Sequence, residues 1–435
     1  MQNQNYRYSV LTLSLLMLGI STATSANSDV NAEVAQLRAE LKELKALVQQ
    51  QAQQVQTQSQ VTQHTAEMQQ KLTDQVTQAK NSAASLKTAT GSEFKLYGNV
   101  RADVSYQSEG GGPAHPYNQM NRVPLKGVAE NSDQFKSTLS ATRLGFDFKT
   151  PVSEGNVTGK VEVDFLGGAN LDNLRIRHAY LNYGNWLVGQ TWSNFAVPDY
   201  MPETIDALGY VGGAVKRGPQ IRYNYSLQPS THLVVALEDP KDSSINLRLP
   251  ALTARLNQSF SDNAGTFSLR GLVNEKKTAN DEVTAWGVGA GVKYNLTPQT
   301  TFKADYYHVK GDSAFVSWAN AGIVKNAAQD IVAENEFDSI TIGLTQQFHP
   351  QWRGTLAYGY MKADVDTDYK QSGVDLTTVN KELWQAWGNV FYSPTKPISL
   401  GLEYVYGERE SVGKAANGSN KGEDNRINAV AIYNF

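Results

Sequence analysis

From residue 94 to residue 435 the chain consists almost entirely of segments about ten residues long in which apolar and polar side chains alternate. In the first of these segments Leu96 and Val100 share one parity, whereas Arg101 and Asp103 share the other. Lipid offers no hydrogen-bonding partner to a peptide group, so a sheet in a membrane must close on itself. Each strand then turns one face to lipid and the other to the lumen. The pattern therefore predicts an all-β fold, a transmembrane β-barrel.

The composition agrees with a membrane protein that does not cross the bilayer with helices. Of the 435 residues 40% are hydrophobic, yet beyond the N-terminus no run approaches the roughly 20 apolar residues that a membrane helix needs. The 35 Gly and 21 Tyr suit strands with aromatic girdles at both membrane interfaces. A formal net charge of -3 argues against a nucleic-acid partner. The absence of Cys excludes disulfides, thiolate metal sites and cysteine nucleophiles.

The alternation and the turn residues between segments predict sixteen antiparallel strands in a barrel domain of residues 92–435. The expected strands are 94–106, 136–149, 155–165, 173–183, 185–192, 219–227, 230–238, 247–260, 264–274, 283–294, 299–310, 337–348, 352–363, 380–392, 397–409 and 424–435. Tight turns such as 151–154 follow the even-numbered strands, and longer loops such as 193–218 and 311–336 follow many odd-numbered strands. Outer-membrane barrels have short periplasmic turns and longer outer loops. We therefore expect both ends of the barrel chain in the periplasm.

Residues 1–26 have the features of a secretory signal peptide. Arg7 precedes an apolar run at 10–20, and the small residues Thr24 and Ala26 stand at the −3 and −1 positions of a cleavage site. The alternative, an N-terminal membrane anchor, is disfavoured because the run is too short to span a bilayer.

The next region, 27–91, is expected to form a periplasmic α-helical coiled coil. One heptad register, with Val34 at position a and Leu37 at position d, runs through it without a break, and 29–87 contains no Pro, Gly or aromatic residue. Peptidoglycan or a periplasmic protein would be its partner. The stretch from Gln49 to Gln70 has few apolar residues, which leaves a Gln-rich linker as the alternative.

A barrel of about sixteen strands holds a water-filled lumen unless something narrows it. Loop 193–218 is the candidate, and it carries the acidic residues Asp199, Glu203 and Asp206. Arginines of lumen parity, or assigned to the lumen with them, form the predicted basic wall of the constriction: Arg101, Arg143, Arg175, Arg177, Arg222, Arg255 and Arg270. Guanidinium groups bind carboxylates bidentately, so this wall favours small anions. Alternatively, these arginines only pair with neighbouring acids.

Two arginines of this set do not fit a regular strand. Arg175 and Arg177 share parity with Leu181 and Tyr183, which are expected to face lipid. A β-bulge, in which one extra residue reverses the parity, would place both arginines in the lumen.

Several segments resemble trimeric porins of Gram-negative bacteria. The run from Arg177 to Ser193 is similar to their fourth strand and third loop, and the segments 389–394, 400–410 and 426–435 resemble the DcaP-type porins. The resemblance implies a homotrimer in the outer membrane, in contact with lipid and lipopolysaccharide, with a third loop folded into the pore. It also implies uptake of small anionic solutes, dicarboxylates in particular. Val430 and Ile432 depart from the polar residues expected at lumen parity in the last strand.

No catalytic constellation is found in the chain. The six His residues have no metal-ligand spacing, and no Ser, His and carboxylate stand in a recognisable order, so we expect neither an enzyme nor a cofactor nor a metal site. A trimeric adhesin would supply only a short barrel segment from each chain, and here one chain supplies all the strands. The sequence thus predicts a passive channel for small anions, with a general diffusion porin as the alternative.

Overall fold

The computed structural model describes residues 86–89, 91–110, 115–128 and 132–435, together with five helical residues of the N-terminal region: Ala39, Lys42, Lys45, Ala46 and Gln49. The chain divides into two compact units, 1–82 and 83–435. The predicted signal peptide and nearly all of the predicted coiled coil lie outside the described residues and remain predictions. Within the part of the chain that is described, no helix has the length and apolar character needed to cross a membrane.

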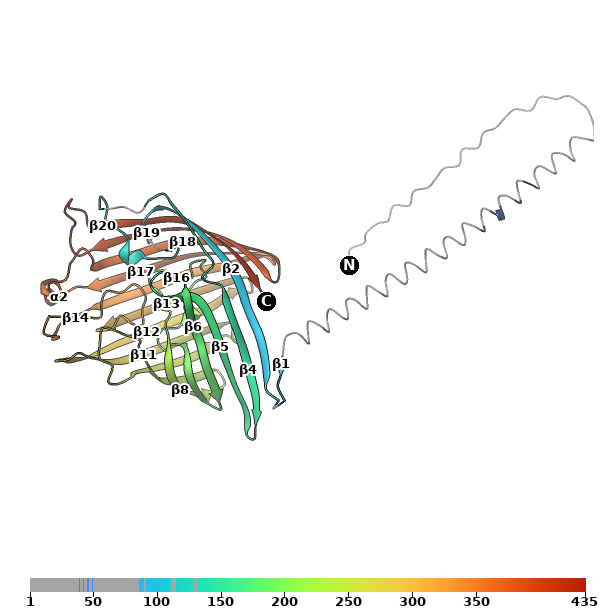
Figure 1. Ribbon diagram of the computed structural model, residues 1–435, viewed down its shortest axis with the longest axis horizontal. Helices are drawn as coiled ribbons and strands as arrows, with labels where there is room; N and C mark the ends of the chain where they lie inside the picture. Colours follow the sequence, from blue (N-terminus) through green and yellow to red (C-terminus); the bar gives the residue numbers. More distant parts are fainter. Residues whose placement is uncertain are drawn as a thin grey trace, which may run out of the picture. The chain divides into compact units, whose positions relative to one another are not determined.

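The second unit is built on one antiparallel sheet of 18 strands. Two of these, β1 (Leu86–Lys87) and β3 (Gln134–Thr138), are short and pair only with β2, which leaves sixteen strands in the closed wall. The wall strands are β2 (Glu93–Glu109), β4 (Arg143–Val152), β5 (Gly155–Gly167), β6 (Asn173–Tyr183), β7 (Trp186–Trp192), β8 (Arg217–Gln228), β9 (Thr231–Glu238), β10 (Ala251–Phe260), β11 (Gly265–Lys277), β12 (Glu282–Thr297), β13 (Thr300–Lys310), β16 (Glu336–His349), β17 (Trp352–Asp364), β18 (Asn380–Thr395), β19 (Ile398–Ser411) and β20 (Lys421–Asn434). The predicted sixteen-stranded antiparallel barrel is confirmed (Figure 1).

One predicted strand, 136–149, is divided in the structure. β3 ends at Thr138 and β4 begins at Arg143, and the residues between them turn away from the ladder. The Thr142 hydroxyl accepts a hydrogen bond from the backbone N–H of Arg101 at 3.1 Å. A side chain thus satisfies a backbone donor of β2 where the neighbouring backbone has left the sheet.

The first and last wall strands close the barrel. β2 pairs with β20, and at the end of the chain the backbone groups of Phe435 and Gly98 exchange two hydrogen bonds of 3.0 and 3.1 Å. The Phe435 ring lies over Gly98, where a Cβ atom would come within 2.7 Å of the ring. The C-terminal residue therefore fixes the seam directly.

The two ends of the barrel differ in their connections. At one end, the short-turn end, neighbouring strands are joined by tight turns, for example between β4 and β5. At the other, the long-loop end, eight connections occur in chain order, which we number L1 (110–133), L2 (168–172), L3 (193–216), L4 (239–250), L5 (278–281), L6 (311–335), L7 (365–379) and L8 (412–420). L1 contains η1 (Met120–Arg122), L3 contains η2 (Pro198–Tyr200), L6 contains the hairpin β14 (Ile323–Lys325) and β15 (Ile331–Glu334), and L7 contains α2 (Thr367–Gln371).

Four of these loops share one apolar core with the lumen face of the wall. Met120 of L1, Phe195 of L3, Phe315 of L6 and Tyr369 of L7 are each no more than 2% exposed and belong to one cluster. The Phe195 and Phe315 rings meet edge to face with centroids 6.1 Å apart. L3 is therefore not the only loop that folds inward, which the alternation pattern could not indicate.

Candidate functional site

Glycines in the wall strands allow L3 to lie directly on the inner surface of the barrel. A Cβ atom at Gly343 of β16 would stand 2.6 Å from the Pro202 ring, and one at Gly359 of β17 would stand 2.7 Å from the carbonyl carbon of Val211. Real Cβ atoms essentially never approach closer than 3.0 Å. The absence of side chains at these positions thus sets how far L3 is held from the lumen axis.

Apolar and acidic wall residues hold L3 from beneath. Ile205 packs on Phe391 and Val430, which explains why the last strand carries an apolar residue at lumen parity. The Glu403 carboxylate of β19 accepts hydrogen bonds from the Ile205 backbone N–H at 2.9 Å and from the Tyr210 hydroxyl at 2.6 Å. The position of L3 is therefore fixed by both packing and hydrogen bonds.

Two acidic residues of L3 reach arginines of the wall. Asp199 is 62% exposed at its side chain, and its nearest cation is the Arg255 guanidinium at 3.6 Å. Glu203 forms a bidentate pair with Arg353 of β17, with Nε and Nη2 at 2.8 to 3.1 Å from its oxygens. Glu203 is thus largely neutralised, whereas Asp199 keeps most of its hydration.

The third acid, Asp206, has a side chain that is almost completely buried where L3 meets L1. Its carboxylate accepts hydrogen bonds from the backbone N–H of Asn118 at 2.7 Å and of Leu208 at 2.8 Å. Burial raises the pKa of Asp206 to about 7, although the Arg426 guanidinium 3.6 Å away opposes the shift. Asp206 therefore joins L3 to L1 and is not a free charge on the constriction surface.

A β-bulge in β6 places two predicted arginines in the lumen. Glu162 of β5 pairs with His178, and the next residue of β5, Val163, pairs with Ile176, so Arg177 is the extra residue. Ile176 is 54% exposed on the outer face of the wall. The reversal of parity that the arginine spacing requires is thus present.

The bulge gathers arginines around two carboxylates. Arg177 donates from Nε to Glu162 at 2.6 Å and from Nη1 to Asp164 at 2.9 Å, and Arg175 holds Asp164 through two hydrogen bonds of 2.8 and 2.9 Å. Arg143, from β4, lies 3.4 Å from Glu162 and is 34% exposed at its side chain. Three guanidinium groups therefore share two carboxylates, and one positive charge remains in excess.

Two further arginines of β8, Arg217 at its first position and Arg222 near its middle, have no carboxylate within ion-pair distance among the described residues. Arg222 donates to the Gln220 side chain at 2.9 Å and to the backbone carbonyl of Trp192. Arg217 lies over the Trp192 ring, 4.3 Å from its centroid. Their charges add to the positive side of the lumen.

The two remaining arginines of the predicted wall are held closely by acids. Arg101 binds Asp103 through Nε and Nη2 and also donates to the Ile205 carbonyl of L3. Arg270 is fully buried beneath L3, where it pairs with Asp305 and the Tyr307 hydroxyl. The Arg101 side chain is thus partly exposed to the lumen, whereas the Arg270 side chain is buried between the wall and L3.

Some of these groups line a cavity of about 630 Å³ between L3 and the wall. Its charged lining consists of Arg101, Arg143, Arg175, Arg177, Arg217, Asp164, Glu203 and Asp206. Five guanidinium groups thus face three carboxyl groups, and one of those, Asp206, has a raised pKa. L6 contributes Trp318, so the cavity is bounded by two loops.

Three arginines in this region were missed by the sequence analysis. Arg353 and Arg426 have the lumen parity of their strands and could have been included by the same criterion. Arg217 precedes the predicted start of its strand, at a position where parity gave no signal. Among residues 86–89, 91–110, 115–128 and 132–435, no group of three or more His, Asp or Glu side chains is placed to hold a metal ion.

A closed sixteen-stranded barrel with a loop folded against its inner wall and a charged cavity beside that loop defines a porin-type channel of the outer membrane. A family model described as the DcaP outer membrane protein matches residues 20–435, and the chain belongs to this family.

The solved structures most useful for comparison are porins and related channels. The outer membrane channel DcaP of Acinetobacter baumannii is 38% identical, with a TM-score of 0.73, over 81% of this chain and 100% of that chain. The anion-selective porin from Comamonas acidovorans is 12% identical, with a TM-score of 0.52 over 79% of this chain and 100% of that one, and shares the fold. Among curated proteins, none matches the chain.

Proposed function

We propose that the channel admits small anionic solutes, dicarboxylic acids among them, through the gap between L3 and the arginine-rich wall. The excess of guanidinium over carboxylate groups in the cavity carries this proposal. A solute that replaces part of its hydration by guanidinium donors is stabilised there if it is an anion and repelled if it is a cation. Because the donors are shared with wall acids, binding stays weak enough for release.

The arginines of the predicted basic wall contribute unequally to the proposed anion preference. Arg217 has no carboxylate within ion-pair distance among the described residues, and Arg143 has the longest ion pair of the arginines that line the cavity, 3.4 Å to Glu162, so we assign these two the largest effect on permeating ions. Arg175 and Arg177 share their charge with Asp164, and Arg270 would act by holding L3 in place.

The proposal is tested by a double variant in which both Arg143 and Arg217 are replaced by Ala. The measurement is the reversal potential of the channel in a salt gradient. One unit charge about 6 Å from an ion in water contributes roughly 0.7 kcal/mol, or about threefold in local ion concentration. The double variant should therefore lose most of the anion preference. Arg248→Ala is the matched control, because Arg248 is an exposed L4 residue paired with Glu275.

The rival function is a general diffusion pore, in which wall acids cancel the arginine field. Weak ion selectivity in the unaltered protein, with no current block by millimolar succinate, would favour the rival. An unchanged reversal potential in the double variant would show that these two residues do not line the permeation path.

We also propose a homotrimer, embedded in lipid and lipopolysaccharide, with the long-loop end at the cell exterior and the N-terminal region in the periplasm. Short turns at one barrel end and long loops at the other support this orientation. A trimer form of the outer membrane protein OmpT of Vibrio cholerae, 16% identical, has the same fold at a TM-score of 0.50 over 79% of this chain and 99% of that chain. Light scattering of the purified protein and of a variant lacking residues 29–90 would test the trimer and the predicted coiled coil's part in it.

A further inference from the structure

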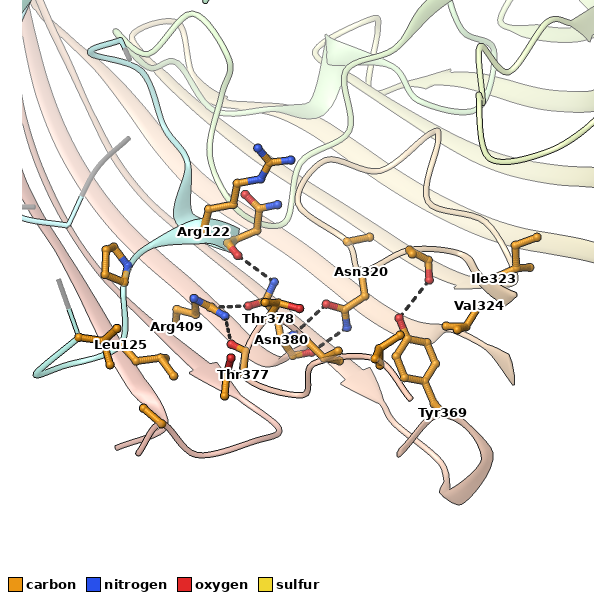
Figure 2. Close-up of a pocket in the computed structure, with 18 of the residues that line it drawn as sticks. Arg122, Leu125, Asn320, Ile323, Val324, Tyr369, Thr377, Thr378, Asn380 and Arg409 are labelled. Atoms are coloured by element: carbon orange, nitrogen blue, oxygen red, sulfur yellow. Dashed lines mark hydrogen bonds between the residues drawn. The ribbon is translucent and has the colours of Figure 1, made fainter. Parts of the chain in front are cut away.

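A second cavity, larger than the one beside L3, lies at the long-loop end. Its volume is about 1020 Å³, and it is bounded by L1, L6, L7 and L8 (Figure 2). Much of its lining is aliphatic, including Leu125, Ile323, Val324, Val374 and Val379. We call this cavity the vestibule.

The charged residues of the vestibule are all cationic. Its lining includes Arg122, Lys325 and Arg409 and contains no Asp or Glu. The Arg122 side chain is exposed and has neither a hydrogen bond nor an ion pair with any described residue. Lys325 donates only to the backbone carbonyl of Ser244, at 2.8 Å. Both charges are therefore available to a ligand.

Arg409 is buried at the floor of the vestibule without a carboxylate partner. It is 5% exposed and donates to the Asn380 side chain at 2.6 Å and to the backbone carbonyl of Thr377 (Figure 2). It also donates to the backbone carbonyl of Val123. Neutral carbonyls satisfy its hydrogen-bonding groups, and its positive charge is balanced only in part, by the more distant carboxylate of Asp375. Asn380 in turn exchanges two hydrogen bonds of 2.8 Å with Asn320 of L6, so this floor joins L1, L6 and L7.

We propose that the vestibule binds carboxylates with an apolar body, such as medium-chain fatty acids, before they reach the constriction. The carboxylate would be held by a cationic group of the lining, Arg122 or Lys325, and the apolar body would lie against neighbouring aliphatic side chains. This inference rests on the proposed anion uptake and adds a preference that the arginine-rich cavity does not have. A small dianion such as succinate gains little on aliphatic walls, whereas each buried methylene strengthens binding by about fourfold.

The test is current block of the channel in planar bilayers by octanoate and by butanoate, added on the long-loop side. Octanoate has four more methylenes, so with partial burial we expect half-block at a concentration at least about tenfold lower. An exposed ion pair strengthens binding by up to about threefold to fivefold. Arg122→Gln combined with Lys325→Gln removes both cationic groups that can form such a pair and should therefore raise the octanoate concentration for half-block by about threefold to fivefold. Block by succinate should change little, because it depends on the constriction.

Lys370→Gln provides the matched control, since Lys370 is an exposed cation on α2 outside the vestibule lining. Absence of octanoate block, equal block by octanoate and butanoate, or equal weakening by Lys370→Gln would overturn the inference. The Arg143 and Arg217 double variant separates the two proposals. Both proposals are supported if the double variant loses its anion preference and is blocked by octanoate as strongly as the unaltered protein is. If the unaltered protein itself has no anion preference, the proposed function is removed and the vestibule result stands by itself.

Discussion

A methyl group at position 359 should push L3 off the wall and narrow the channel. In Gly359→Ala the new Cβ atom would overlap the Val211 carbonyl oxygen and lie 2.7 Å from the Val211 carbonyl carbon. Non-bonded carbons settle at about 3.5–4.0 Å, so the carbon contact alone requires a movement of roughly 1 Å, and the oxygen contact requires more. β17 cannot yield, because it is paired with β16 and β18 along its whole length. The loop must therefore move toward the lumen.

The contacts that such a movement breaks give the magnitude. The Val211 backbone N–H donates to the Gln385 side chain at 3.3 Å, and the Ser339 hydroxyl donates to the Gly212 carbonyl at 2.9 Å. A displacement of about 1 Å loses both hydrogen bonds, at roughly 0.5–1.5 kcal/mol each. We therefore expect Gly359→Ala to lower the free energy of unfolding by about 1–3 kcal/mol and to reduce single-channel conductance.

Planar-bilayer recordings and the temperature at which the folded band is lost in gel electrophoresis would measure the two effects. Gly271→Ala is the control, because a Cβ atom at Gly271 meets nothing within 4 Å. If Gly359→Ala matched Gly271→Ala in both conductance and thermal stability, the absence of a side chain at position 359 would not determine the position of L3.

Two other predictions concern buried charges. The pKa of Asp206 is raised from 3.8 to about 7, so the contribution of this carboxyl to stability is fully present below pH 3.8 and is lost as pH rises through 7. Asp206→Asn is neutral at every pH, so its unfolding temperature should rise relative to that of the unaltered protein as the pH increases from 4 to 8. A difference in unfolding temperature that stayed constant across that range would contradict the raised pKa of Asp206. Lys276 is buried between Asp242 of L4, at 2.7 Å, and Asp312 of L6, at 2.6 Å. Lys276→Met leaves both carboxylates without their cation and should cost about 3–5 kcal/mol, measured as a lower unfolding temperature; no change would show that water replaces the ammonium group.

The alternation of side chains was sufficient to predict the barrel, because each strand has a lipid face and a lumen face of different chemistry. For β6 the predicted and observed bounds coincide at 173 and 183. The predicted strand 136–149 was wrong in its middle, because the Thr142 side chain replaces a backbone partner there and the side-chain pattern does not register such an exchange.

The site was less predictable than the wall. Parity indicates that Arg143 and Arg270 point inward, but only the path of L3 decides that Arg143 is partly exposed and that Arg270 lies buried beside Asp305. The inward folding of L1, L6 and L7 left no periodic signal, because these contacts join residues far apart in the sequence. Which of the arginines meet a permeating solute stays a prediction.

The extra residue in β6 makes the charge of this channel depend on spacing as well as on residue type. Before Arg177 the even-numbered side chains, such as Ile176, meet acyl chains, and after it the odd-numbered ones, such as Leu181, do. If β6 kept every residue but paired without the bulge, the two environments would be exchanged for the residues before His178, and the guanidinium groups of Arg175 and Arg177 would turn toward hydrocarbon. Relatives with the same residues in a regular strand would therefore have a different pore, even though their amino-acid composition would be the same.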